Sequence, residues 1–196
     1  MIRSNLFLAC VISIVSSTFF SCGDDDIMAT ENELINQVTL TFAPTSGGIP
    51  LVYVFSDPDG DGAAPATQDD IVLRSGSSYT LAIAFENTID GEDITAEIRE
   101  EDEEHMIFFG WTQGRFSVPG GDGNIGEGER DDPIVYADFD ENLNPLGVLT
   151  TWVAGDAGTG AFTVLLKHQP GIKSRTSDST DGETDVEITW NIEIEE

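Results

Sequence analysis

The chain has 196 residues, of which 37 are Asp or Glu and only 8 are Lys or Arg, so its formal net charge at pH 7 is −29. A field of this sign repels nucleic acid and anionic lipid headgroups and concentrates cations, which excludes nucleic-acid binding as a function. Hydrophobic residues make up 39% of the chain and recur with clear periodicity, so the sequence is not that of a disordered acidic tail.

The first segment of the chain has the pattern of an export signal. Arg3 supplies a positive charge, and residues 6–20 form an apolar run that is interrupted only by Ser, Thr and Cys. This run is shorter than the roughly twenty apolar residues that a helix needs to cross a bilayer. The residues before Cys22 follow the pattern of a lipobox. We therefore predict a lipoprotein signal peptide over residues 1–21 and lipidation of Cys22.

An acidic stretch follows the predicted lipidation site. Three aspartates, residues 24–26, come one glycine after Cys22, and we expect residues 22–33 to form a hydrated tether that anionic headgroups repel. Cys10 and Cys22 are the only cysteines of the chain, and Cys10 would leave with the signal peptide. The processed chain would then have no free thiol for a disulfide, a thiolate metal site or a nucleophile.

Residues 34–196 have the pattern of a single domain built mainly of strands. Apolar and polar residues alternate at 38–42, 51–55 and 79–85, and further strands are expected at 106–111, 116–118, 134–139, 146–153, 161–168 and 186–194. Residues 93–104 are the one helical candidate, because Asp93 suits an N-cap and Ile94 and Ile98 lie one turn apart. We expect an all-β fold, an antiparallel β-sandwich that is immunoglobulin-like in layout, with one short acidic helix.

The sharpest motif is the run DPDGDG at residues 57–62. Carboxylates on alternate residues, Asp57, Asp59 and Asp61, followed by Gly, can curl around a hard cation such as Ca²⁺. The chain has Gln68 where an EF-hand would need Glu, so the prediction is a Ca²⁺-stabilised loop between two strands and not an EF-hand. The alternative is a tight Asp/Gly turn whose side chains cap their own backbone. Residues 138–144 echo the pattern more weakly and suit a hairpin connection without an ion.

The two histidines of the chain, His105 and His168, each lie at the end of an expected strand with the parity of its apolar residues. Held by rigid strands, the two imidazoles could converge on a transition metal, with Glu103, Glu104 or Met106 nearby, or bracket a haem iron axially. The alternative is that each is a half-buried histidine bonded to backbone at the rim of a sheet. The sequence does not show whether the two strands are neighbours.

Catalytic motifs do not stand out in this sequence. It has no nucleophile elbow with a Ser/His/Asp order, no Walker loop and no H-E-x-x-H. We therefore expect that the protein is not an enzyme.

Several of these segments together resemble a group of small, uncharacterised flavobacterial lipoproteins. The shared features are the acidic tether, the loop at 57–62, the acidic segment with "EH" and aromatics at 92–109, "H-x-P" at 168–170 and "GETDVEIT" at 182–189. The resemblance implies a Bacteroidota lineage and an outer-membrane lipoprotein facing the outside, and it suggests a TonB-dependent receptor as partner. The alternative is that the acidic tether is a solvated linker of a lipoprotein that stays in the periplasm. Some members carry the label "type 1 periplasmic binding fold", which implies a two-lobed βα architecture that the strand pattern does not support.

Two hypotheses follow. The leading one is an outer-membrane, surface-exposed lipoprotein that acts as a non-enzymatic binding module for a metal or haem beside a TonB-dependent receptor. In it, His105 and His168 bind a transition metal or haem iron, while Asp57, Asp59 and Asp61 bind Ca²⁺. The alternative is a structural or adhesive surface lipoprotein with at most a Ca²⁺-stabilised loop.

Overall fold

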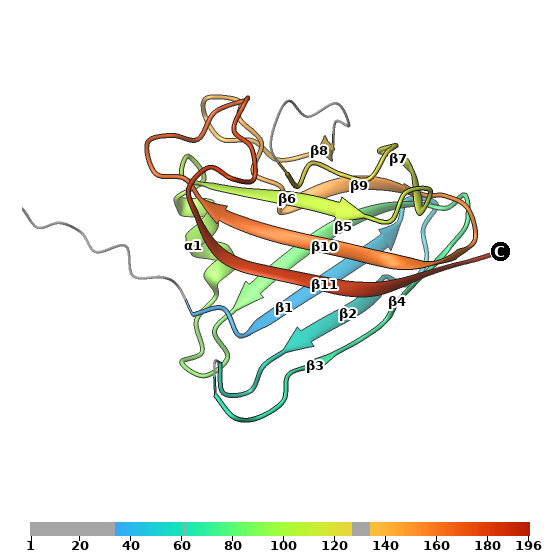
Figure 1. Cartoon of the computed structure of the whole chain (residues 1–196), viewed down its shortest axis with the longest axis horizontal. Helices are drawn as coiled ribbons and strands as arrows, with labels where there is room; N and C mark the ends of the chain where they lie inside the picture. Colours follow the sequence, from blue (N-terminus) through green and yellow to red (C-terminus); the bar gives the residue numbers. More distant parts are fainter. Residues whose placement is uncertain (1–33, 61, 127–133) are drawn as a thin grey trace, which may run out of the picture. The chain divides into compact units, whose positions relative to one another are not determined.

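The computed structural model describes residues 34–60, 62–126 and 134–196, and over these residues two β-sheets face each other (Figure 1). All of them belong to one unit, Asn32–Glu196. The predicted signal peptide, the tether and Cys22 lie outside the described residues. The predicted all-β, sandwich-like fold with one short helix is confirmed, but the sandwich is not wholly antiparallel as expected, because the second sheet contains one parallel pair. The immunoglobulin-like layout stays a prediction.

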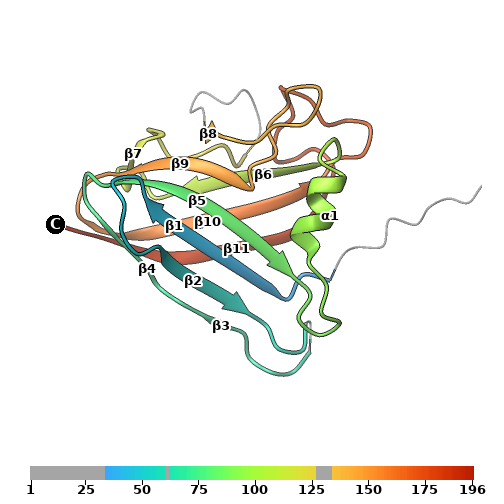
Figure 2. The same ribbon diagram turned by 180° about the vertical axis from the view of Figure 1, so that it is seen from behind.

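The first sheet is entirely antiparallel and faces the viewer in Figure 2. Its strands lie in the order β3 (Thr67–Gln68), β2 (Leu51–Ser56), β1 (Gln37–Pro44), β5 (Ser78–Glu86), β9 (Leu149–Ala154) and β7 (Phe116–Val118), and β8 (Val135–Tyr136) also pairs with β9. The expected strand at 134–139 is therefore reduced to the two residues of β8.

The second sheet carries the two histidines. Its order is β4 (Ile71–Arg74), β11 (Glu183–Glu195), β10 (Gly158–His168) and β6 (His105–Trp111). β10 pairs antiparallel with both neighbours, whereas β4 runs parallel to β11. Strand β4 was missed in the sequence because four residues between turns are too few to establish an alternation.

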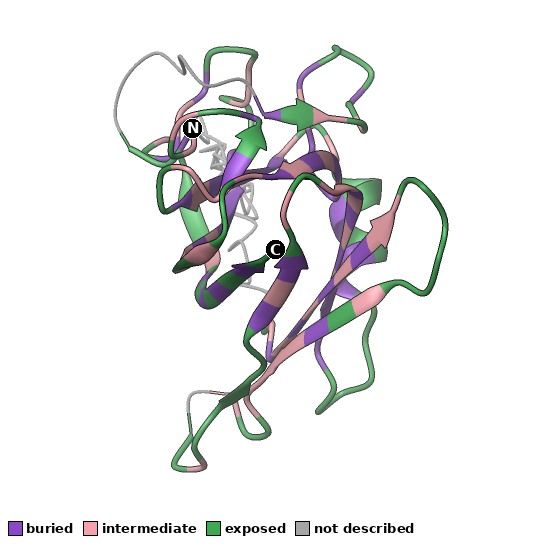
Figure 3. Cartoon of the chain, turned by 90° about the vertical axis from the view of Figure 1, so that its right-hand side faces the viewer, coloured by how far each residue is buried: buried purple, intermediate pink, exposed green. Residues whose placement is uncertain are grey.

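The core lies between the sheets, where every second residue of a strand is buried (Figure 3). Phe162 of β10 is fully buried, and its ring centroid lies 5.3 Å from that of Trp152 in β9 and 6.2 Å from that of Phe42 in β1. Phe109 of β6 lies 5.3 Å from Trp152 in the same way. These edge-to-face aromatic contacts join the sheets and fix which face of β6 and β10 points inward.

Strand β6 is buried on both of its faces, which a two-layer sandwich alone does not produce. Ile107, Phe109 and Trp111 belong to the main core, whereas Met106 and Phe108 form a second cluster with Leu165 on the outer face. Met106 therefore points away from the inward face that it would need to share with His105.

The only helix among the described residues, α1 (Ile94–Glu100), positions the start of β6. The Asp93 carboxylate accepts a hydrogen bond from the backbone N–H of Ala96 at 3.2 Å, and Ile94 and Ile98 are buried, as the sequence predicted. The helix ends earlier than the expected residue 104, and the turn at residues 101–104 leads directly into His105.

Candidate metal site

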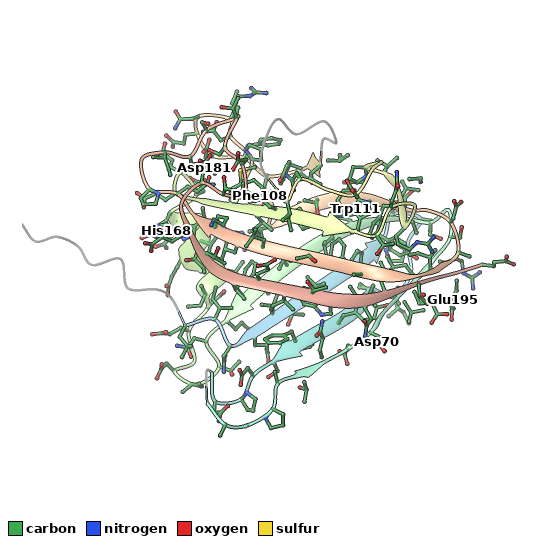
Figure 4. All side chains as sticks on the ribbon, in the orientation of Figure 1. Asp70, Phe108, Trp111, His168, Asp181 and Glu195 are labelled. Carbon is green, nitrogen blue, oxygen red and sulfur yellow. The ribbon has the colours of Figure 1, made fainter. Side chains whose placement is uncertain are left out.

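The two histidines are brought together by the pairing of β6 with β10. His105, the first residue of β6, lies directly opposite His168, the last residue of β10. Their rings are stacked with centroids 4.6 Å apart and planes inclined by 10°. Figure 4 shows His168 at the end of β10 beside α1. The two strand-end histidines predicted from the sequence thus form one cluster.

His105 is a buried imidazole whose tautomer is set by its surroundings. Its Nδ1 lies 3.2 Å from the backbone oxygen of Glu101, and because a carbonyl oxygen only accepts, Nδ1 carries the hydrogen. Burial lowers the pKa of His105 to about 4; the Glu101 hydrogen bond opposes this shift and the neighbouring His168 adds to it. The ring is therefore neutral near pH 7, and its Nε2 holds an unshared electron pair.

The remaining nitrogen of His105, Nε2, faces a carboxylate. Asp185 Oδ2 lies 3.8 Å away, and the two side chains are only 2% and 4% exposed. Burial raises the pKa of Asp185 to about 6, although His168 and Lys167 lower it. Because His105 is neutral near pH 7, this contact is not an ion pair, and 3.8 Å is too long for a hydrogen bond.

His168 is the more accessible of the two imidazoles. Its Nε2 lies 3.2 Å from Glu104 Oε2, with the histidine side chain 14% exposed and the glutamate 44%. Glu101, the C-cap of α1, lies beside both rings: one ligand atom of each of Glu101, His105 and His168 lies within 4.8 Å of the others. Two imidazoles and a carboxylate at this spacing can bind a divalent transition metal after small side-chain rotations.

A metal would require the stacked rings to splay. Two nitrogens on one tetrahedral metal lie about 3.3 Å apart, with each metal–nitrogen distance about 2.0–2.1 Å. Parallel rings at 4.6 Å direct their in-plane electron pairs alongside each other, so a rotation of His168, the less buried ring, is needed to aim both at one ion.

Haem does not fit this pair. Axial imidazoles lie on opposite sides of a haem iron, so that the whole macrocycle passes between them. Here the ring centroids lie 4.6 Å apart and the His105 side chain is 2% exposed, which leaves no room for a porphyrin between the rings. The structure therefore does not support the haem expectation for His105 and His168.

The surface beside this cluster is strongly acidic. A shallow depression at the end of α1 is lined by Arg99 and by six carboxylates, Glu100, Glu101, Asp102, Glu103, Glu104 and Glu141. Glu103 itself is engaged elsewhere, since its Oε1 accepts a hydrogen bond from Asn142 Nδ2 at 2.8 Å. Of the neighbours expected from the sequence, Glu104 therefore contacts a histidine, whereas Glu103 and Met106 do not belong to the cluster.

The aspartate loop at residues 57–62 shows backbone capping where it is described. Asp57 Oδ1 lies 3.5 Å from the Asp59 backbone N–H, and Asp59 Oδ2 accepts a hydrogen bond from Ala64 at 2.9 Å. These contacts are those of an Asp/Gly turn. Asp61 lies outside the described residues, so a Ca²⁺ ion held by Asp57, Asp59 and Asp61 stays a prediction.

The weaker echo of that motif, at residues 138–144, is a connection whose carboxylates contact backbone N–H groups and a lysine. Asp138 accepts hydrogen bonds from the backbone N–H groups of Gly147 and Leu149, both at 2.9 Å. Asp140 Oδ2 lies 3.2 Å from Lys173 Nζ, and neither side chain is exposed. Lys173 Nζ also donates to the backbone oxygen of Asp102, which links this loop to the turn before β6.

Asp185 is the residue of the cluster that the sequence does not reveal. Val186 and Ile188 face the core, so strict alternation would turn Asp185 toward solvent, as it does Glu187. Its inward position comes from an irregularity in the strand that has no recognisable sequence pattern. Glu101 falls within the acidic helical candidate at residues 93–104, where no pattern distinguishes it from the neighbouring acids.

Comparisons of the chain with protein-family models, with curated proteins and with solved structures found no match. Among the described residues, no helix is long and apolar enough to span a membrane.

Proposed function

We propose that this protein is a non-enzymatic binding module for a divalent transition-metal ion, held at the outer membrane by a lipidated Cys22. The observation that carries the metal site is the meeting of Glu101, His105 and His168, whose ligand atoms lie within 4.8 Å of one another. Glu101 caps the C-terminal end of α1, and His105 and His168 are end residues of β6 and β10, so elements of regular structure position them. The lipid anchor rests on the sequence pattern alone.

The ligand types favour one group of metals. Imidazole nitrogen suits Zn²⁺, Cu²⁺ and Ni²⁺, whereas Ca²⁺ and Mg²⁺ prefer sites made wholly of oxygen. Cu⁺ favours thiolate or thioether ligands, but Met106 lies on the opposite face of β6 and no cysteine follows Cys22. We therefore propose Zn²⁺ or Cu²⁺ as the ion at this site.

The charge of the chain supports the capture of a cation. The net charge of −29 and the six carboxylates around the depression at the end of α1 raise the local concentration of divalent ions beside the histidines. The acidic surface supplies attraction without selectivity, since exposed carboxylates stay hydrated. Selectivity between metals would come from the two imidazoles.

The position of the site suits delivery to a partner in the membrane. β1 begins at the end of the sandwich that carries α1 and the two histidines (Figure 1). The predicted lipidation site, Cys22, precedes β1 in the sequence, so the lipid anchor is connected to the domain through the start of β1. We propose a TonB-dependent receptor, the partner suggested by the resemblance to flavobacterial surface lipoproteins, as the recipient of the metal.

Thermal unfolding of the purified chain tests the metal site. After treatment with a chelator, Zn²⁺, Cu²⁺, Ca²⁺ or haemin is added singly, because a ligand that prefers the folded state raises the midpoint by mass action. The proposal predicts a rise with Zn²⁺ or Cu²⁺ that His168→Ala abolishes. No rise with either metal, or an equal rise in His168→Ala, would contradict it. A rise with Ca²⁺ alone would favour the structural or adhesive alternative.

A further inference from the structure

Asp185 reaches the histidine cluster through a β-bulge. In the pairing of β10 with β11, Leu166 lies opposite Val186 and Lys167 lies opposite Thr184, so Asp185 is an extra residue without a cross-strand partner. A bulge of this kind re-aims a side chain and is frequent beside functional sites. Here it turns the carboxylate of Asp185 inward, where the side chain is 4% exposed.

The inner oxygen of this carboxylate has no hydrogen-bond partner within the described part of the chain. Asp185 Oδ2 is buried, and burial of an unpaired carboxylate oxygen is costly unless a cation or a donor compensates it. Lys167, a cation of the adjacent strand, donates instead to Thr184 Oγ1 at 3.0 Å. The buried oxygen is therefore an acceptor that the surrounding protein leaves unused.

The group that faces this oxygen is also electron-rich. His105 donates its Nδ1–H to the Glu101 carbonyl, which is the usual second contact of a metal-binding histidine and leaves Nε2 bare. The 3.8 Å between Nε2 and Asp185 Oδ2 lies between about 3.3 Å, expected for neighbouring ligands of a tetrahedral metal, and about 4.2 Å, expected for ligands on opposite sides of it. Two atoms with unshared electron pairs, a nitrogen and an oxygen, therefore face each other at the spacing of metal ligands.

We propose that Asp185 is the carboxylate ligand of the metal, binding it through Oδ2 opposite His105 Nε2, and that the exposed Glu101 is not required. This inference rests on the proposed function, because it names a ligand of the same site. Glu104 acts differently, since its contact with His168 Nε2 orients that ring, as carboxylates do behind metal-binding histidines. The bulge in β11 is then the feature that builds the site.

Matched amide substitutions distinguish the contributions of the three carboxylates to metal affinity. The Zn²⁺ affinity of Asp185→Asn, Glu101→Gln and Glu104→Gln is measured by competition with a chromogenic chelator near neutral pH, beside His105→Gln/His168→Ala. We expect Asp185→Asn to weaken Zn²⁺ binding at least about 100-fold, Glu104→Gln about 10-fold and Glu101→Gln less than about threefold. The visible absorption of bound Co²⁺ should change in Asp185→Asn, because it reports the ligands themselves.

The outcomes distinguish this inference from the proposed function. Affinity within threefold of the unmodified chain in Asp185→Asn, or an equal loss in Asp185→Asn and Glu101→Gln, overturns the role of Asp185. Affinity retained in the double histidine variant overturns the proposed function itself. If Asp185→Asn were to misfold, Asp185→Glu keeps the carboxylate and changes its reach by one methylene. An unchanged Co²⁺ spectrum in that variant would also overturn the assignment.

Discussion

His105 and His168 face each other across two antiparallel strands, with their rings stacked 4.6 Å apart. The register of β6 against β10 sets this relationship, and the aromatic core sets the register. Phe162 and Trp111 form one cross-strand pair of the same ladder, six residues from the histidines along each strand. The packing of the core and the geometry of the site are therefore coupled through two rigid strands.

Truncation of Phe162 tests the core that holds those strands. The ring is fully buried and contacts Phe42, Phe109 and Trp152. Phe162→Ala should lower the free energy of unfolding by about 3–5 kcal/mol, through lost burial and the cavity left behind. Urea denaturation measures the loss. Ile49→Ala, at a side chain that is 86% exposed, is the control and should change stability by less than about 0.5 kcal/mol.

Removing only one partner of the buried ion pair between Lys173 and Asp140 should strongly lower the free energy of unfolding. Burial alone would raise the pKa of Asp140, but hydrogen bonds from Asn144 and Lys173 outweigh it and lower the pKa, so the carboxylate is charged at neutral pH. Lys173→Met leaves this buried charge without its cationic partner and should lower the free energy of unfolding, measured by urea denaturation, by about 3–5 kcal/mol.

Two further variants test whether that loss comes from the unpaired buried charge. Lys173→Met combined with Asp140→Asn removes both charges and should recover part of the stability. Arg74→Met removes an exposed cation and serves as the control, with an expected change below about 0.5 kcal/mol. A loss under about 1 kcal/mol in Lys173→Met alone would mean that water reaches Asp140 and replaces the ammonium group.

Replacing Asp185 should stabilise the metal-free protein above pH 6 while it weakens metal binding. The pKa of this carboxyl is raised from 3.8 to about 6 by burial, so the folded state favours the protonated form. The stability contributed by that proton is complete below about pH 4 and is lost as the pH rises to about 6. Asp185→Asn imitates the protonated form, so above pH 6 it should exceed the unmodified chain by about 2–3 kcal/mol.

The contribution of His105 to stability should change with pH in the opposite direction in the same experiment. Its pKa is lowered from 6.5 to about 4 by burial, so its contribution is complete above about pH 6.5 and is lost as the pH falls toward 4. The difference in stability between the unmodified chain and His105→Gln should therefore grow with rising pH over this range. Urea denaturation in chelator from pH 4 to 8 measures both differences, and equal slopes for the two variants would contradict the assigned pKa shifts.

A substitution at Gly182 should displace the backbone of His168 and so change the metal site indirectly. Its φ is +73°, and an added Cβ would collide with the backbone oxygen of His168. Gly171 has a φ of +69° and open space around it, so Gly171→Ala carries the same backbone strain, about 1–2 kcal/mol, without the collision. Gly182→Ala should lower Zn²⁺ affinity at least about 10-fold more than Gly171→Ala does, and equal affinities would show that the His168 backbone does not position the ring.

Much of the fold could be predicted because its signals are local. The alternation in β1, β5 and β11 marks one buried face directly, and Asp93 with Ile94 and Ile98 marks the helix. Strand β4 escaped prediction because its stability comes from a parallel pairing with β11, more than a hundred residues away in the sequence. Pairings at such separations leave no mark in a short segment.

The candidate site was predictable only in part, for the same reason. Strand parity placed His105 and His168 on inward faces at strand ends, but their meeting depends on the register of β6 against β10. Asp185 could not be predicted, since a bulge reverses the side that alternation assigns to it. Axial ligation of a haem iron also depends on the distance between the two rings, which strand parity does not give.

Pulsed electron paramagnetic resonance of the protein loaded with one equivalent of Cu²⁺ tests the central claim most directly, because it counts the imidazoles bound to the ion. The predicted result is one Cu²⁺ per chain with two imidazole nitrogens, falling to one in His168→Ala. A spectrum of the unmodified protein that shows one imidazole or none, or that is unchanged in His168→Ala, would contradict a metal site shared by His105 and His168.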